Sequence, residues 1–189
     1  MPELIAPTVR LHAAWTRAHE EWGPGHHEDG FGLLPSDETA SSEGFAAWVA
    51  RLADASGGPA QDDQAQGDQA EGDPAVRAAS DRARCTYRWI VEGDEVLGGI
   101  ALRHGNGDRV PEFGHIGYGI RPSARRRGLA TWALGRMLEE ARGLGLDRVL
   151  LTCAVGNTAS ARTITRHGGV FEGIRETRFG AVRRYWIEV

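Results

Sequence analysis

The spacing of apolar residues in the N-terminal quarter predicts a short strand followed by two helices. A strand is expected at residues 4–8. Apolar side chains then recur at helical spacing over residues 11–22, which predicts an amphipathic helix that ends at Gly23. A second helix with a narrow apolar stripe is expected around residues 45–52. We expect the two helices to pack side by side.

The centre of the chain predicts a meander of three antiparallel strands. Two strand-like runs, residues 84–92 and 95–104, flank Gly93 and Asp94, which form a hairpin signal. A third run follows at residues 112–120. Strands that follow one another through short turns pair in antiparallel fashion.

The C-terminal third predicts two helices that alternate with strands. The expected elements are a helix at residues 128–144, a buried strand at 149–153, a helix capped by Asn157 and stopped by Gly168 and Gly169, and strands at 170–179 and 181–189. The order of all elements predicts an α/β (α+β) fold, with a mixed, mostly antiparallel sheet of about seven strands, four helices and one parallel crossover.

Residues 55–78 interrupt this pattern with Gly, Pro, Gln, Asp and Ala in near-repeats. The segment has too little apolar surface to offset the entropy of ordering it, so we expect a mobile low-complexity insertion. The chain of 189 residues otherwise fits a single domain, residues 1–189.

Composition and charge exclude several classes of protein. The chain is 41% hydrophobic and 25% charged, which is typical of a soluble globular protein, and no apolar run is long enough to span a membrane. The first seven residues lack the features of a secretory signal, so we expect a cytoplasmic protein. The net charge of -4 argues against a nucleic-acid binder.

The sequence also argues against a metal centre or a redox role. Cys85 and Cys153 match no metal-ligand spacing, and in the cytoplasm they are expected to be free thiols. The cluster at residues 26–29, His-His-Glu-Asp, has no partner ligands spaced to complete a metal site. It lies between the first two helices, where its acidic groups would suit a cationic amine.

Residues 117–131, GYGIRPSARRRGLAT, carry the most specific chemical signal. A strand ends at Arg121-Pro122, and a helix begins several residues later. A helix start offers free backbone N–H groups and a positive dipole end, and Gly128 lets the main chain approach a phosphate closely. The turn lacks the patterns of ATP-binding and dinucleotide-binding loops, because neither Gly-Lys-Ser/Thr nor G-x-G-x-x-G is present.

This stretch resembles the signature of the GNAT superfamily of N-acetyltransferases, Arg/Gln-x-x-Gly-x-Gly/Ala, with Arg125, Gly128 and Ala130 at its three fixed positions. The resemblance spans roughly residues 84–189. It implies the GNAT acyl-CoA acyltransferase fold, with acetyl-CoA as cosubstrate and direct transfer of the acetyl group to an amine. The acceptor would be a small-molecule amine or a peptide N-terminus. No nucleic acid and no membrane is expected as a partner, and a homodimer is compatible with the resemblance. The alternative is a catalytically degenerate acyl-CoA-binding sensor or partner protein.

The resemblance assigns the residues that would hold the cosubstrate. The pyrophosphate would lie on the main chain of residues 126–131, and the pantetheine arm would pair with the strand edge at residues 118–120. The positions expected to bind acetyl-CoA are Tyr118, Gly119, Ile120, Arg125, Arg126, Arg127, Gly128, Leu129, Ala130, Thr131, Asn157 and Ser160. Helix capping alone also explains Asn157 and Ser160.

The resemblance assigns the proton-transfer groups less directly. His115 stands where many relatives carry a glutamate that removes the amine proton, and a packed histidine without a catalytic role is the other interpretation. Glu112 is the reserve candidate for the base. Ile164 occupies the place of a tyrosine that protonates the departing thiolate in relatives, so water or one of three side chains would replace that acid: Ser160, Tyr185 or His167.

Overall fold

The computed structural model of the chain describes residues 1–23, 30–57, 84–105, 110–178 and 180–189. The helices of this part are η1 (Val9–Leu11), α1 (His12–Trp22), α2 (Ser42–Ala55), α4 (Val110–Phe113), η2 (Pro122–Ala124), α5 (Leu129–Gly143) and α6 (Thr158–Arg166). Its strands are β1 (Glu3–Ile5), β2 (Cys85–Glu92), β3 (Glu95–Arg103), β4 (Ile116–Ile120), β5 (Arg148–Ala154), β6 (Val170–Thr177) and β7 (Gly180–Glu188). The predicted α/β fold with seven strands is confirmed.

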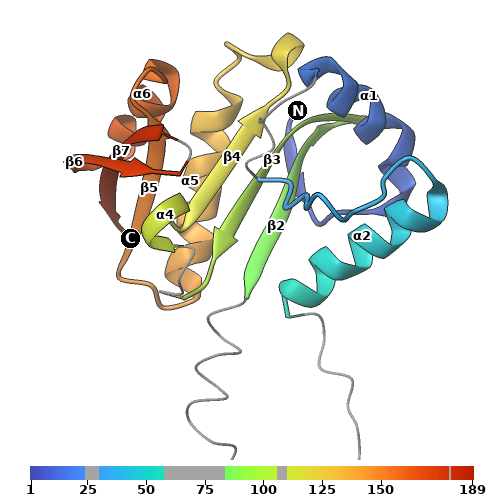
Figure 1. Cartoon of the computed structure of the whole chain (residues 1–189), viewed down its shortest axis with the longest axis horizontal. Coiled ribbons are helices and arrows are strands. Elements are labelled where there is room, and N and C mark those ends of the chain that lie inside the picture. The colour runs from blue at the N-terminus through green and yellow to red at the C-terminus, as the bar shows by residue number, and fades with distance from the viewer. Residues whose placement is uncertain (24–29, 58–83, 106–109, 179) are drawn as a thin grey trace, which may run out of the picture.

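The strands form two antiparallel sheets instead of one continuous mixed sheet. The first has the order β1-β2-β3-β4 and the second the order β5-β7-β6. The expected parallel pair does not form: β4 and β5 splay apart, and the residues just before β4 contact β5 through the bridge between Gly114 and Leu151 and through hydrogen bonds between His115 and Leu150. Figure 1 shows β4 at the border of the first sheet, with the second sheet beyond it.

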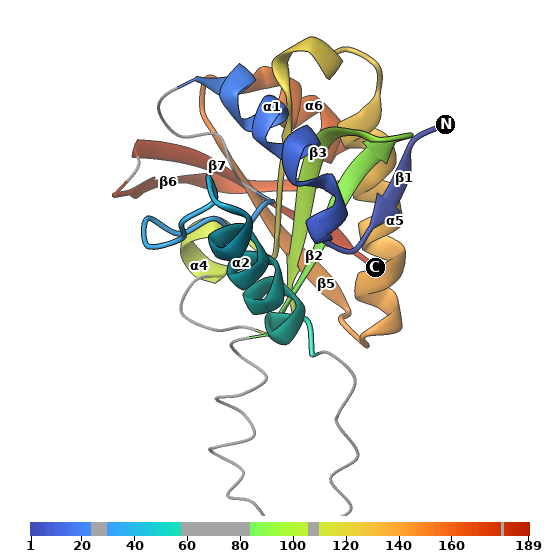
Figure 2. The same cartoon turned by 90° about the vertical axis from the view of Figure 1, so that its right-hand side faces the viewer.

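Helices cover both faces of the first sheet (Figures 1 and 2). On one face α1 and α2 pack side by side, as predicted: the Trp15 ring lies 4.7 Å from Trp48 and 5.5 Å from Phe45. On the other face α5 buries its apolar stripe, including Leu134 and Met137, against β3 and β4. Burial of large apolar side chains on both faces is the main force that holds this sheet between its helices.

The third strand of the predicted meander is shorter than expected. Residues 112–115 are not strand: Glu112 belongs to the four-residue helix α4, and β4 begins only at Ile116. Gly114 explains the break, because its φ is +76° and a Cβ there would lie 2.6 Å from the Leu150 carbonyl oxygen. The chain therefore turns against β5 before it enters the sheet.

Two expectations from the sequence concern residues that are not described. Most of the low-complexity segment, residues 55–78, and the polar cluster at residues 26–29 lie outside the described part of the chain. Within the described part, no helix is both long enough and apolar enough to cross a membrane.

Candidate cofactor and active site

The start of α5 forms an open, uncapped group of backbone N–H donors. Gly128 is the N-cap residue, with a φ of +77°, and it supplies no side-chain hydrogen bond to the first turn. Arg126 also has a positive φ, +68°, which is uncommon for a residue other than glycine. A Cβ on Gly128 would meet nothing within 4 Å, so the space in front of the helix is open. Consecutive N–H groups in such a turn suit an anion.

The three arginines of this turn are directed differently. The Nε of Arg125 donates to the carbonyl oxygen of Ile120 over 3.0 Å. The guanidinium of Arg127 lies 2.6 Å from the Glu92 carboxylate, at the end of β2. Arg126 is exposed and has no ion pair with a described residue. Of the three, Arg126 is therefore the most available to neutralise a phosphate.

The edge of β4 that faces the second sheet carries a polar pair. The hydroxyls of Tyr118 on β4 and Ser160 on α6 lie 2.9 Å apart. Burial raises the pKa of Tyr118 to about 12, so its hydroxyl is protonated at neutral pH. Asn157 caps α6, as predicted, because its Oδ1 accepts the Ser160 N–H over 3.0 Å.

His115 is buried between the two sheets, with 1% of its surface exposed. Its N–H donates to the Leu150 carbonyl oxygen over 2.6 Å, and the Leu150 N–H donates to its Nδ1 over 2.9 Å. Burial, with a smaller effect of the charge on Arg103, lowers its pKa to about 4. Because Nδ1 already accepts a bond, the proton of the neutral ring lies on Nε2. The geometry therefore argues against the expected role of His115 as the base and favours a structural one.

Glu112 lies one helical turn before His115 and is more accessible. The exposed fraction of its side chain is 30%, and its Oε1 pairs with Arg178 Nε over 3.0 Å. In a continuous strand, alternation would set Glu112 and His115 on opposite faces, but Glu112 lies on α4, outside the strand, so this alternation does not apply. Of the two candidates, Glu112 has the proton-accepting group that a substrate can reach, because the imidazole of His115 is enclosed.

The sequence matches a known family over most of its length. The model of the family described as acetyltransferase (GNAT) domain matches residues 39–170. The chain belongs to this family. Membership makes it an acetyl-CoA-dependent acyltransferase, with acetyl-CoA as cosubstrate. No curated protein sequence matches the chain.

Solved structures of several acetyltransferases share the fold of this GNAT domain. Mycobacterium smegmatis RimJ in complex with CoA-disulfide has a TM-score of 0.66 and 18% identity, over 100% of this chain and 82% of that chain. The microcin C7 self-immunity acetyltransferase MccE, in complex with acetyl-CoA and AMP, has a TM-score of 0.64 and 12% identity, over 100% and 92%. An acetyl transferase from Salmonella typhimurium that modifies the N-terminal serine of ribosomal protein L7/L12 has a TM-score of 0.61 and 17% identity, over 100% and 95%.

Three side chains were expected to replace the thiolate acid that is absent at Ile164, and they lie in different environments. Ile164 is completely buried in the core, and Tyr185 is 5% exposed in the same cluster. His167 follows the C-terminal end of α6, where its Nε2 lies 2.8 Å from the Thr131 carbonyl oxygen. Seven residues separate it from Ser160, about 10 Å along a helix. Of the three side chains, Ser160 is the one whose hydroxyl lies within hydrogen-bond distance of the Tyr118 hydroxyl on β4.

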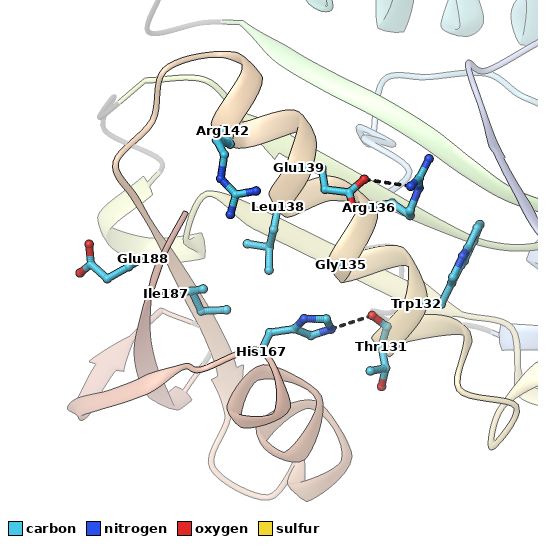
Figure 3. A pocket seen from close by; sticks show the side chains of 10 residues that line it. All are labelled: Thr131, Trp132, Gly135, Arg136, Leu138, Glu139, Arg142, His167, Ile187 and Glu188. Carbon is cyan, nitrogen blue, oxygen red and sulfur yellow. Dashed lines mark hydrogen bonds and ion pairs between the residues drawn. The ribbon is translucent and has the colours of Figure 1, made fainter.

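A shallow hollow of about 560 Å³ lies along α5 (Figure 3). Thr131 and His167 border one end, and Arg142 lies toward the other end of the helix. Arg136 is paired with Glu139 over 2.9 Å in the same wall. Of the residues expected to bind acetyl-CoA, Thr131 is the one that lines the hollow, and His167, a candidate acid, borders it as well.

Sequence reasoning missed two acidic residues near the turn that is expected to hold the pyrophosphate: Glu92, which pairs with Arg127, and Glu21, which contacts the segment just before the turn. Glu21, at the end of α1, accepts hydrogen bonds from Ser123, which precedes the turn. Glu21 and Ser123 are 102 positions apart, and no local pattern marks such a contact.

Proposed function

We propose that this GNAT domain moves an acetyl group from acetyl-CoA to a primary amine by direct attack of the amine on the thioester carbonyl. The observation that carries the proposal is the uncapped start of α5, where Gly128 leaves open space before free N–H donors. MccE was solved with acetyl-CoA and RimJ with a CoA disulfide, which supports the same cosubstrate here.

The described residues fit the two ends of such a molecule. The N–H groups of residues 126–131, with the exposed side chain of Arg126, would hold the pyrophosphate. Within the described part of the chain, the edge of β4 at residues 118–120 has no strand partner on the side of β5, so its backbone can pair with the amide groups of the pantetheine arm. Asn157 and Ser160 start α6 beside that edge.

Two proton transfers complete the reaction. Glu112 would take the proton of the attacking amine, because its carboxylate is accessible and His115 is not. The hydroxyl pair of Tyr118 and Ser160 would donate to the departing thiolate, in place of the tyrosine for which Ile164 stands. A thiol pKa of roughly 8.5 makes the thiolate a tolerable leaving group even with a weak acid.

The proposed acceptor is a peptide N-terminus or a small amine, met in the cytoplasm. The similar Salmonella protein that modifies the N-terminal serine of L7/L12 supports peptide N-termini as the first class to test. The second candidate function is an acyl-CoA sensor without turnover, which the buried Ile164 favours because it cannot protonate a thiolate.

Turnover separates the two functions. The protein is incubated with acetyl-CoA and a panel of peptide N-termini and small amines, and free coenzyme A and acetylated product are measured together. We expect equal amounts of both with at least one acceptor. For that acceptor, Glu112→Gln should lower kcat/KM by about 10²-fold and leave acetyl-CoA affinity unchanged. Tight binding of acetyl-CoA without product from any acceptor would establish the sensor instead.

A further inference from the structure

Glu21 joins α1 to the segment that leads into the phosphate-binding turn. Its Oε1 accepts the Ser123 N–H over 2.6 Å, and its Oε2 accepts the Ser123 hydroxyl over 3.0 Å. The same Oε2 lies 3.2 Å from Nε of Arg121. One carboxylate thus holds both Arg121 and Ser123, although Ser123 is an exposed residue.

The local helix does not explain an acid at this position. Glu21 lies in the last turn of α1, where a negative charge opposes the helix dipole. Burial alone would raise the pKa of Glu21, but the bonds from Ser123 and the charges of Arg121 and Arg125 outweigh it and lower the pKa. The carboxylate is therefore ionised at neutral pH, and its partners among the described residues are Ser123 and Arg121.

The loop is anchored to the sheet just before Ser123. The Arg121 N–H donates to the Leu97 carbonyl oxygen over 2.9 Å, and its guanidinium donates to the Val96 carbonyl oxygen over 3.2 Å. Ser123 then lies in η2, a three-residue turn, and the positive φ of Arg126 follows two residues after that turn. From α1, Glu21 restrains this path through its contacts with Ser123 and Arg121.

We propose that Glu21 is a positioning residue that holds the turn of residues 125–131 in the conformation that binds the pyrophosphate. The inference rests on the proposed acetyl-CoA site. Without the carboxylate the turn samples other conformations, and the apparent affinity falls by the fraction of molecules that still have the competent one. The chemistry at the thioester is unaffected once acetyl-CoA is bound.

The test compares three variants of the full chain by calorimetric titration with acetyl-CoA and by steady-state kinetics. Glu21→Ala should raise the Kd and the KM for acetyl-CoA by about 3- to 30-fold, with kcat and the KM for the amine nearly unchanged. Glu21→Gln should have a smaller effect, because its amide oxygen still accepts from Ser123 but carries no charge for Arg121. Glu20→Ala removes an acid from the same helical turn, without a described bond to the loop, and should bind like the wild type.

Each outcome decides the proposal. Wild-type affinity in a folded Glu21→Ala variant would overturn it, and so would an equal loss in Glu20→Ala. If Glu21→Ala does not fold, Glu21→Gln decides: an unchanged Kd overturns the proposal, and a raised Kd with normal kcat supports it. A wild-type protein that does not bind acetyl-CoA would overturn the proposed function itself, and the positioning role with it.

Discussion

At the scale of single residues, His115 shows how a polar side chain can replace a strand partner. Its main chain and its ring both bond to Leu150, so an imidazole nitrogen accepts the N–H that a carbonyl oxygen would accept in a regular ladder. A third bond, from the Arg103 N–H to the His115 carbonyl oxygen, ties the same residue to β3. His115 therefore links the first sheet to the second at the point where they separate.

This role predicts a specific pH dependence of stability. The pKa of His115 is about 4 in the folded protein and 6.5 as a free group, so the unfolded chain binds the additional proton between these values. The contribution of the neutral His115 to the free energy of unfolding is complete above pH 6.5. It is lost as the pH falls toward 4, and the loss is on the order of 3 kcal/mol. Denaturant unfolding at pH 7 and pH 4.5 should show a smaller decrease in His115→Gln than in the wild type. An equal decrease in both would contradict the buried neutral imidazole.

At the scale of elements, long periodic segments were predictable and short ones were not. The stripe of α5 and the glycine at its start predicted that helix to within one residue at each end, because periodicity and a positive φ both leave a local signal. The four-residue helix α4 is too short to show a periodic pattern, so the strand predicted from the sequence began too early, at Glu112. The position of Gly114 against β5 depends on a contact between distant segments, which the sequence does not encode locally.

The same limit applies to the candidate site. The open turn before α5 was predictable because a single stretch contains the strand end, the arginines and Gly128, and its binding of acetyl-CoA stays a prediction. The pairing of Arg127 with Glu92 and the contact of Glu21 with Ser123 depend on the folded sheet. The burial of His115 also became evident only with β5 in place, because a strand histidine has the same sequence pattern whether it is packed or exposed.

The connection from α2 to β2 permits a test of the predicted insertion. Ser56 Oγ donates to the Cys85 carbonyl oxygen over 3.1 Å, so the two flanks of the segment are held together by described residues. A Cβ on Gly57 would lie 2.9 Å from a guanidinium nitrogen of Arg84, which places the two ends close to each other. Replacing residues 58–83 with a Gly-Ser linker of about six residues should therefore keep the fold.

In that replacement we expect the Tm to change by only a few degrees and the Kd for acetyl-CoA to stay within about twofold. Thermal unfolding and calorimetric titration measure the two quantities. A loss of several kcal/mol in the free energy of unfolding, or a clear loss of affinity, would show that the segment belongs to the core or to the site. It would also contradict the proposal that residues 1–189 are one domain with a dispensable insertion.

At the scale of the whole molecule, the two sheets and three helices converge on one place. The free edge of β4, the start of α5 and the start of α6 meet where the sheets separate, and α1 reaches the same loop through Glu21 (Figures 1 and 2). The hydrophobic core holds the sheets and α5 together. A few polar contacts hold the loop that joins β4 to α5. We therefore propose that function depends on the uncapped start of α5, which the sheets and the core hold in place.

The central claim is that the start of α5 holds acetyl-CoA, and a pair of glycine variants tests it most directly. Gly128 and Gly145 have nearly equal φ values, +77° and +76°, and a Cβ on either would meet nothing within 4 Å. A glutamate at either position therefore brings the same backbone strain, of roughly 1 kcal/mol, and the same charge. In our account, only the glutamate at position 128 would stand against a bound pyrophosphate and repel it. Calorimetric titration with acetyl-CoA should show at least about 10²-fold weaker binding for Gly128→Glu and wild-type binding for Gly145→Glu. Equal affinity in the two folded variants would place the cosubstrate elsewhere and contradict the account.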